Sequence, residues 1–371
     1  MSLIELALPN IQRLAPYVPG KPIEELEREL GITDILKLAS NENPLGASPR
    51  ARAAIDAALH ALALYPDGSG FRLRQAIARR QGLSAEGVTL GNGSNDVLDL
   101  IARAYLGPGR EAVFSEHAFA VYPIATQSVG ADARVARAHG MDHPMPYGSD
   151  PQALADAVGP RTRVLFVANP NNPTGTWIGR EALRALLDAV PAHVLVVVDE
   201  AYTDYVEDPD FPDAAAWLPD YPNLIVTRTF SKIHGLAALR VGYALSHPSV
   251  ADALNRVRQP FNVNTLALIA AEAALEDTEH LQRSRELNTR GLAQLKAAFA
   301  ERGLGYIPSV ANFLTVDVAR PAQPVFEALL REGVIVRPVA NYGLPNHLRV
   351  TIGRAQENAR FLTALDKVLG L

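Results

Sequence analysis

The sequence predicts an α/β fold in which a mostly parallel sheet is covered by helices on both faces, with a smaller α+β domain attached. Two observations support this prediction. Short apolar runs without polar alternation recur along the chain, as expected for strands that are buried on both faces. Segments with helical spacing lie between several of these runs, and such alternation is typical of a parallel sheet. The length of 371 residues fits about two domains.

The strands of the large sheet are expected where the apolar runs are rich in Val, Ile and Leu. These runs are residues 111–114, 164–168, 193–200, 223–230 and 240–246. Helices are expected in the segments with helical spacing, which are residues 94–106, 150–159 and 180–190. The parallel sheet should therefore occupy the central part of the chain.

The pattern changes after about residue 265, where long helical stretches begin. Residues 264–303 read as one long helix with a break, and residues 324–333 read as a further helix between the strand-like pieces 312–318 and 348–353. We therefore predict a large α/β domain over residues 46–264 and a small α+β domain that is built from both chain ends, residues 1–45 and 265–371.

Composition and charge exclude several classes of function. The net charge of −5 offers no basic field for nucleic acid or for anionic lipid surfaces. Cys is absent, which removes disulfides and thiolate nucleophiles and suits a reducing compartment. No run approaches the ~18 apolar residues of a membrane span, and the N-terminus does not resemble a secretion signal. We expect a cytoplasmic protein that binds neither nucleic acid nor membranes.

Polar side chains follow three of the expected strands. Asn172 lies just past residues 164–168, and Lys232 follows residues 223–230. Asp199 lies at the end of residues 193–200, and Tyr202 lies just past it. Ligands of open α/β sheets bind beyond the carboxyl ends of the strands, so these groups should meet in one crevice. Each has an ordinary alternative: Asp199 could cap a helix, Asn172 could form a turn, and most lysines are simply solvated.

The neighbours of Lys232 favour a phosphate site. Thr229, Ser231 and Arg240 supply two hydroxyls and a guanidinium, a set that would hold a phosphate dianion. Ser94 follows glycines and precedes a helical pattern, so backbone N–H groups there could also face an anion, although an ordinary helix cap explains the same pattern. An amine, a carboxylate and a phosphate cradle are together what pyridoxal phosphate requires, because it needs a Schiff-base partner and an anion at its ring nitrogen.

Several motifs resemble those of a known family. NNPTG (171–175), DEAY (199–202) and TFSK…LRVGY (229–243) are similar to motifs of the fold-type-I pyridoxal-phosphate aminotransferases. More narrowly, the chain resembles the histidinol-phosphate aminotransferases over nearly its whole length. The segments that carry this narrower resemblance are residues 15–22, 38–46, 64–70, 258–264 and 334–353.

The resemblance implies roles for the cofactor residues. Lys232 would bind the cofactor aldehyde and later carry a proton, Asp199 would pair with the ring nitrogen, and Tyr202 with Asn172 would bond the ring oxygen. Phe119 would stack on the ring. The cofactor phosphate would be held by Ser94, Asn95, Thr229, Ser231 and Arg240, with Tyr65 reaching across from the partner subunit of a homodimer.

The resemblance also implies a substrate side formed by Tyr17, Asn43, Arg337 and Arg349. Both arginines could instead be surface residues. Departures from the family pattern, at Ile233-His234, Ala238 and Asn95-Asp96, concern the packing of the cofactor loop. His139 and His143 are four residues apart, but Gly140 and Pro144 argue against a helix there, so no metal site is expected.

The expected reaction is reversible, double-displacement transamination between L-histidinol phosphate and 2-oxoglutarate, which gives imidazole-acetol phosphate and glutamate. Three alternatives remain open at this point. They are an aromatic amino-acid aminotransferase, a threonine-phosphate decarboxylase of the same fold, and a ligand-sensing regulatory domain built on that fold. The last would need a DNA-binding segment, which neither the chain ends nor the acidic charge supply.

Overall fold

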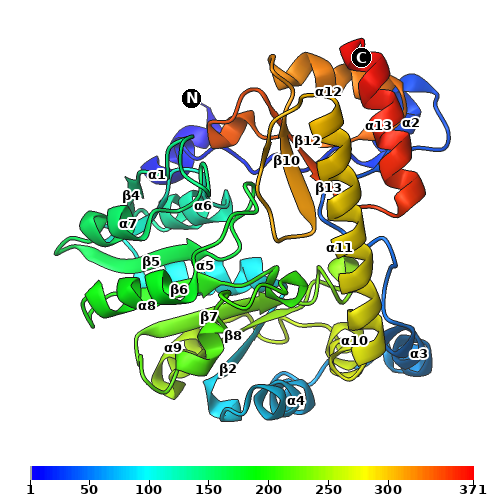
Figure 1. Cartoon of the computed structure of the whole chain (residues 1–371). Helices are drawn as coiled ribbons and strands as arrows, with labels where there is room; N and C mark the ends of the chain where they lie inside the picture. The colour runs from blue at the N-terminus through cyan, green and yellow to red at the C-terminus, as the bar shows by residue number, and fades with distance from the viewer. Residues whose placement is uncertain (1) are drawn as a thin grey trace.

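A computed structural model describes residues 2–371 of the protein. A seven-stranded sheet forms the centre of its larger part. The strand order is β2-β8-β7-β6-β5-β3-β4 (Figure 1). Strands β3 to β7 all run parallel to one another, whereas β8 is antiparallel to β7 and to β2. The predicted mostly parallel sheet is thus confirmed. The bounds are β2 Val88–Gly91, β3 Glu111–Ser115, β4 Asp132–Ala136, β5 Thr162–Ala168, β6 Leu195–Asp199, β7 Leu224–Thr229 and β8 Gly242–Ser246.

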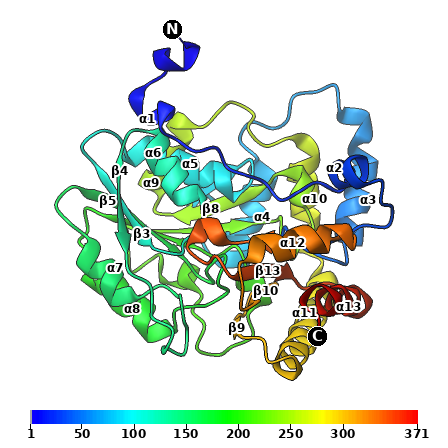
Figure 2. The same ribbon diagram turned by 90° about the horizontal axis from the view of Figure 1, so that it is seen from above.

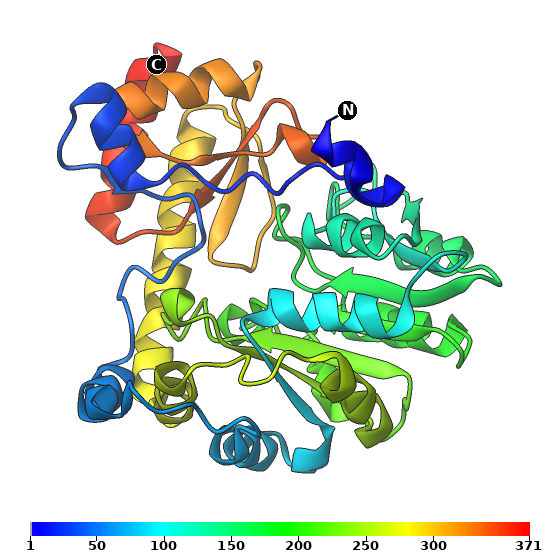
Figure 3. The same ribbon diagram turned by 180° about the vertical axis from the view of Figure 1, so that it is seen from behind.

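Helices cover both faces of this sheet, because successive strand residues point to opposite sides. Along β5, Leu165 and Val167 belong to one apolar cluster, whereas Val164 and Phe166 belong to another. Figure 1 shows α8 on one face, and Figure 3 shows α5 on the opposite one. The first cluster is completed by α3 Pro49–Ala58, α4 Phe71–Gln81, α7 Pro151–Ala157, α8 Arg180–Ala189 and α10 Thr265–Leu275. The second is completed by α5 Ser94–Tyr105, α6 Val121–Ser128 and α9 Pro248–Val257.

A four-stranded antiparallel sheet forms the smaller part, in the order β12-β13-β10-β9. Its strands pack with helices from the end of the chain around a separate apolar cluster (Figure 2). The smaller α+β part predicted from the sequence is therefore present. The bounds are β9 Tyr306–Ile307, β10 Phe313–Asp317, β12 Arg337–Pro338, β13 His347–Thr351, α11 Thr278–Glu301, α12 Ala322–Arg331 and α13 Ala355–Leu369.

The start of the chain packs against its end. Strand β1 Leu36–Lys37 pairs in parallel with β11 Val334–Ile335, and Leu26 of α2 Ile23–Leu30 packs near Leu330. Further upstream, α1 Pro9–Gln12 lies beside α6, where the Asn10 side chain donates to the carbonyl of Ser128 (Figures 1 and 2). The β1–β11 pairing and the Leu26 contact join the two chain ends, whereas α1 contacts α6 of the larger part. The domain boundaries at residues 46 and 264 stay a prediction.

The break predicted within residues 264–303 lies between α10 and α11. Asp277 ends the gap because its side chain accepts a hydrogen bond from the backbone N–H of His280 and so caps α11. From there α11 runs from beside α10 up to the small sheet (Figure 1). A single long helix therefore connects the two sheets. Within residues 2–371, no helix is long and apolar enough to cross a membrane.

Candidate active site

A cavity of about 260 Å³ lies where the carboxyl ends of β5, β6 and β7 face the small sheet. Most of the residues singled out in the sequence line it, although they come from distant parts of the chain. They are Tyr17, Ser94, Asn95, Phe119, Asn172, Asp199, Tyr202, Thr229, Ser231, Lys232, Arg240, Arg337 and Arg349. The topology explains this gathering, because parallel strands deliver their carboxyl ends to a single edge of the sheet.

Lys232 follows β7 and is held inside the cavity. Its Nζ donates a hydrogen bond to the carbonyl oxygen of Ser40 at 3.0 Å and lies 5.7 Å from the centre of the Tyr202 ring. Burial, helped by the nearby charge of Arg349, lowers the pKa of Lys232 to about 7. A large fraction of this amine is therefore neutral and nucleophilic near pH 7, which an exposed lysine is not.

We expect the reactivity of Lys232 toward aldehydes to rise as the pH increases through about 7, because only the neutral amine attacks a carbonyl. The measurement is reductive alkylation of the cofactor-free protein by a small neutral aldehyde and cyanoborohydride from about pH 5 to about pH 9, with peptide mass spectrometry at position 232. Exposed Lys367 in the same digest is the comparison, because its side chain is not buried. A parallel rise for the two lysines would contradict the prediction.

Asp199 ends β6, is buried and lines the cavity. Thr227 Oγ1 donates to its Oδ1 at 2.8 Å, and the Tyr122 hydroxyl donates to its Oδ2 at 2.9 Å. Burial raises the pKa of Asp199, whereas these two hydrogen bonds lower it. The two donors therefore help to keep a buried carboxylate ionised. Tyr122 and Thr227 were not among the residues predicted from the sequence.

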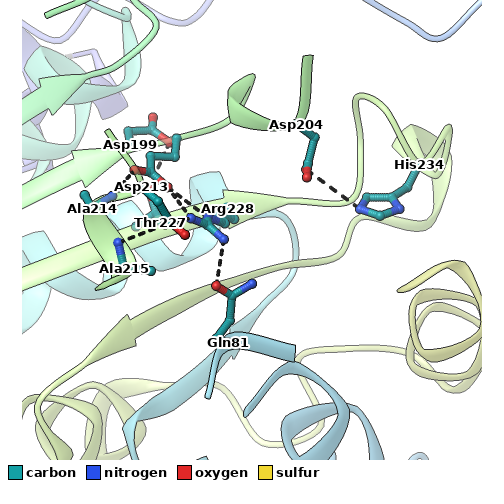
Figure 4. Close-up of polar contacts among 10 residues, drawn as sticks. Gln81, Asp199, Asp204, Asp213, Ala214, Ala215, Thr227, Arg228 and His234 are labelled. Atoms are coloured by element: carbon teal, nitrogen blue, oxygen red, sulfur yellow. Dashed lines mark hydrogen bonds and ion pairs between the residues drawn. The ribbon is translucent and has the colours of Figure 1, made fainter. Parts of the chain in front are cut away.

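A second polar network lies on the other face of the same two strands. Glu200 and Arg228 directly follow Asp199 and Thr227, so their side chains point to the opposite side of the sheet. Arg228 Nη2 contacts Glu200 Oε2 at 2.6 Å and Asp213 Oδ1 at 2.6 Å, and Nη1 donates to Gln81 (Figure 4). The pair fixes the ends of β6 and β7 from behind the cavity.

The residues predicted to hold a phosphate converge at the N-terminus of α5. Arg240 Nη1 donates to Ser231 Oγ at 3.2 Å, and the backbone N–H of Ser231 donates to Thr229 Oγ1 at 3.1 Å. Gly93 and Gly242 permit the close approach of these elements. A Cβ at Gly93 would lie 2.4 Å from Arg240 Nη2, and one at Gly242 would lie 2.4 Å from the Ser94 nitrogen.

Two guanidinium groups close the cavity on the side of the small sheet. Arg349 is buried, and it donates from Nη1 to Asn172 Oδ1 at 2.5 Å and from Nη2 to the Ala39 carbonyl at 2.7 Å. Its Nε has no hydrogen-bond partner among residues 2–371. Arg337 donates to the Val18 carbonyl at 2.6 Å and lies 6.0 Å from the Tyr17 ring. This side of the cavity therefore suits an anionic substrate group.

Two predicted site residues lie outside the cavity lining. The Asn43 amide donates to the Ile233 carbonyl at 2.7 Å and to Ser284 Oγ at 2.9 Å, so its proposed contact with substrate stays a prediction. Tyr65 is 84% exposed and stacks on Phe261 at a centroid distance of 5.0 Å. A tyrosine that acts in a partner subunit would also lie outside its own cavity, and its role stays a prediction.

Asn41 is a further cavity residue that the sequence did not single out. Its side-chain amide donates to the Tyr202 hydroxyl at 2.9 Å, and its backbone N–H donates to Thr351 Oγ1. Burial raises the pKa of Tyr202 to about 12, so this hydroxyl keeps its proton.

His139 and His143 stack at 3.6 Å between centroids. Among residues 2–371 there is no group of three or more His, Cys, Asp or Glu side chains that could hold a metal ion.

Comparison with known proteins decides the family. A family model described as aminotransferase class I and II matches residues 33–365, which is most of the chain. The chain belongs to the aminotransferase class I and II family. This membership confirms the resemblance to aminotransferases that the sequence motifs indicated.

This aminotransferase has similar relatives along its full length. A histidinol-phosphate aminotransferase of Pseudomonas fluorescens is 63% identical over 368 residues, which are 99% of this chain and 98% of the relative. One from Pseudomonas aeruginosa is 61% identical with the same coverage. Among solved structures, a histidinol-phosphate aminotransferase from Sinorhizobium meliloti in complex with pyridoxal-5'-phosphate has a TM-score of 0.89 and 29% identity, covering 98% of this chain and 97% of that one.

Proposed function

We propose that this protein is a pyridoxal-phosphate-dependent histidinol-phosphate aminotransferase of histidine biosynthesis. It transfers an amino group from L-histidinol phosphate to 2-oxoglutarate and so gives imidazole-acetol phosphate and glutamate. The observation that carries the proposal is the cavity, in which Lys232, whose pKa is lowered to about 7, lies with the buried carboxylate of Asp199 and with the anion cradle formed by Thr229, Ser231 and Arg240. The chain is also at least 61% identical to two histidinol-phosphate aminotransferases.

The residues of the cavity fit the cofactor. Lys232 offers the amine for its aldehyde, Asp199 offers an anion for its ring nitrogen, and Ser231 and Arg240 offer donors for its phosphate. Among the described residues 2–371, Arg349 Nε has no hydrogen-bond partner, so this guanidinium keeps an unused donor. When bound, pyridoxal phosphate supplies a conjugated ring that draws electrons away from the α-carbon of the amino substrate.

The protein's own groups would then do the remaining work. Lys232 Nζ would take a proton from the α-carbon of the amino substrate and would deliver it to the carbon that receives the amino group. Tyr202 would donate from a hydroxyl that stays protonated, and Asn172 would donate its amide while Arg349 holds its oxygen. Phe119 would stack on the ring.

The two arginines explain how one site could serve two substrates. A phosphate is the anionic group of the amino donor, and carboxylates are the anionic groups of 2-oxoglutarate. Arg337 and Arg349 both line the cavity and could bind either kind of anion through charge-assisted hydrogen bonds. Because both substrates would use the same guanidinium groups, one product must leave before the next substrate enters, which gives a double-displacement mechanism.

The substrate assignment can be tested by half-reaction spectroscopy. Mixing the yellow enzyme with L-histidinol phosphate, in the absence of 2-oxoglutarate, should convert the absorbance of the bound aldehyde to that of the amine form. Phenylalanine and phosphothreonine are the comparison substrates. Conversion by phenylalanine but not by histidinol phosphate would identify an aromatic amino-acid aminotransferase instead, and release of carbon dioxide from phosphothreonine would identify a decarboxylase.

We also propose that the active form is a homodimer in which Tyr65 reaches the partner's cofactor phosphate, and that it works in the cytoplasm. Exposed large apolar side chains near Tyr65 in the sequence, together with Phe261 that stacks on its ring, support the dimer, because exposed apolar side chains that gather on a surface mark an interaction site. These side chains are Leu59, Leu62, Leu64, Phe71 and Phe261, all exposed.

A mixing experiment tests whether Tyr65 acts across the interface. The variants Lys232→Ala and Tyr65→Ala should each be weak alone. A mixed dimer would contain one site with both defects and one site with neither, so activity should rise on mixing toward a sizeable fraction of the wild type. If Tyr65 served its own subunit, each mixed site would keep one defect, and activity would stay at the average of the two variants.

A further inference from the structure

The carboxylate of Asp199 is held by two hydroxyls whose role neither the sequence motifs nor the family membership assigned. Thr227 is the parallel-register neighbour of Asp199 on β7, and both side chains face the side of the sheet that α5, α6 and α9 cover. Its Oγ1 donates to Oδ1 at 2.8 Å. Tyr122 comes from α6 on that same side and donates to Oδ2 at 2.9 Å.

Tyr122 is itself fixed from three directions. It is fully buried, its ring stacks on Phe166 with centroids 4.9 Å apart and an interplanar angle of 5°, and Phe114 lies against it at 6.4 Å. Phe119, the residue expected to stack on the cofactor ring, meets its ring edge at 5.9 Å. One rigid side chain therefore touches both the expected stacking residue and the expected acid.

The hydrogen-bond count shows what this arrangement leaves open. An ionised carboxylate can accept about four hydrogen bonds, two at each oxygen. Thr227 and Tyr122 use one acceptor site on each oxygen, and the carboxylate also lines the cavity. Both oxygens are thus anchored from the protein side while acceptor capacity remains on the cavity side. Neither donor carries a charge, so neither competes with a cation in the cavity as a salt-bridge partner would.

We propose that Tyr122 and Thr227 form a positioning pair that orients the Asp199 carboxylate toward the cofactor's ring nitrogen. The pair acts only through Asp199. This inference rests on the proposed cofactor, and it adds two residues to the site. A purely structural role for Tyr122 would predict a different pattern, because loosened packing would weaken every cofactor analogue to the same extent.

The test compares two cofactors on the cofactor-free protein: pyridoxal phosphate, and the analogue in which a C–H group replaces its ring nitrogen. Their dissociation constants, followed by quenching of protein fluorescence, give a discrimination ratio that reports the contact between Asp199 and the nitrogen. We expect Tyr122→Phe, which keeps the stacked ring, to reduce this ratio by about tenfold. Thr227→Val, which keeps the side-chain shape, should reduce it by about fivefold.

Two further variants complete the design. In an Asp199→Asn background, adding Tyr122→Phe should change the ratio by less than about twofold, because the residue through which it acts has lost its charge. Tyr221→Phe is the matched control, since the Tyr221 hydroxyl donates to Asp188 Oδ1 at 2.6 Å on the surface, outside the cavity lining. This control should leave the ratio unchanged.

The outcomes separate this inference from the proposed function. If the wild type binds pyridoxal phosphate and Tyr122→Phe and Thr227→Val weaken both cofactors equally, or neither, the positioning pair is overturned while the function stands. If the wild type itself does not discriminate between the two cofactors, the pair is overturned together with the role of Asp199. If Tyr122→Phe does not fold, judged by its melting curve, Thr227→Val alone decides by the same criterion.

Discussion

The variant Lys232→Ala should turn over histidinol phosphate and 2-oxoglutarate at least ~10⁴-fold more slowly than the wild type. Two roles are lost together, because the same amine both attaches the cofactor and moves the proton between the reacting carbons. The position has no ready substitute: Lys232 Nζ is buried, and Lys37, the other lysine near it, is paired with Glu42 at 2.8 Å. Single-turnover absorbance measurements on the cofactor-loaded variant would report the chemical step directly.

Two comparisons make this result specific. Lys367→Ala removes an exposed lysine that pairs with Glu332, and it should leave turnover unchanged. Added methylamine should partly restore the proton-transfer step in Lys232→Ala, because the missing side chain leaves space for a small amine beside the Ser40 carbonyl. A Lys232→Ala variant whose rate lies within about tenfold of the wild type would remove Lys232 from the chemistry.

The strands that could be predicted from the sequence are those that are buried on both faces. The runs at residues 164–168 and 193–200 became β5 and β6 because helices cover both sides and select continuous apolar sequence. Strand β4 was not predicted, since it lies at the sheet edge and four of its five residues are exposed. Strand β2 was also missed, because it is only four residues long.

The site could be predicted only as far as local sequence specifies it. Asp199, Asn172 and Lys232 each follow a buried strand, and parallel topology brings such positions together. The hydroxyl of Tyr122 could not be assigned, because its contact with Asp199 depends on how α6 packs across the sheet. The contact from Thr227 depends on the register between β6 and β7, which a single sequence does not reveal.

The Arg228–Glu200 pair shows the same limit from the other face of the sheet. In sequence, Glu200 looks equivalent to Asp199, since the two are adjacent acids at one strand end. The pleat separates them: Asp199 lines the cavity, whereas Glu200 is buried against Arg228 and accepts from the backbone N–H of Ala214. Period-two alternation could have indicated that only one of the two acids lines the cavity, once the cavity face was known.

Replacing Asp199 by asparagine should leave pyridoxal phosphate bound through Lys232 and the anion cradle but lower kcat by roughly 10²- to 10³-fold. The side chain keeps its size, and only the charge that favours a protonated ring nitrogen is lost. The amide also has one oxygen instead of two, so it can accept from Thr227 or from Tyr122 but not from both in the present geometry. The other hydroxyl would then have to accept from the amide N–H group instead of donating.

The measurement is kcat together with the absorbance of the bound cofactor, which separates loss of catalysis from loss of binding. Asp188→Asn is the matched control, because Asp188 also accepts a tyrosine hydroxyl but lies outside the cavity lining. It should change neither quantity. If Asp199→Asn kept near-normal turnover, the ring nitrogen would not depend on a negative charge at this position, and the buried carboxylate would have to be explained by the packing of β6 against α6 alone.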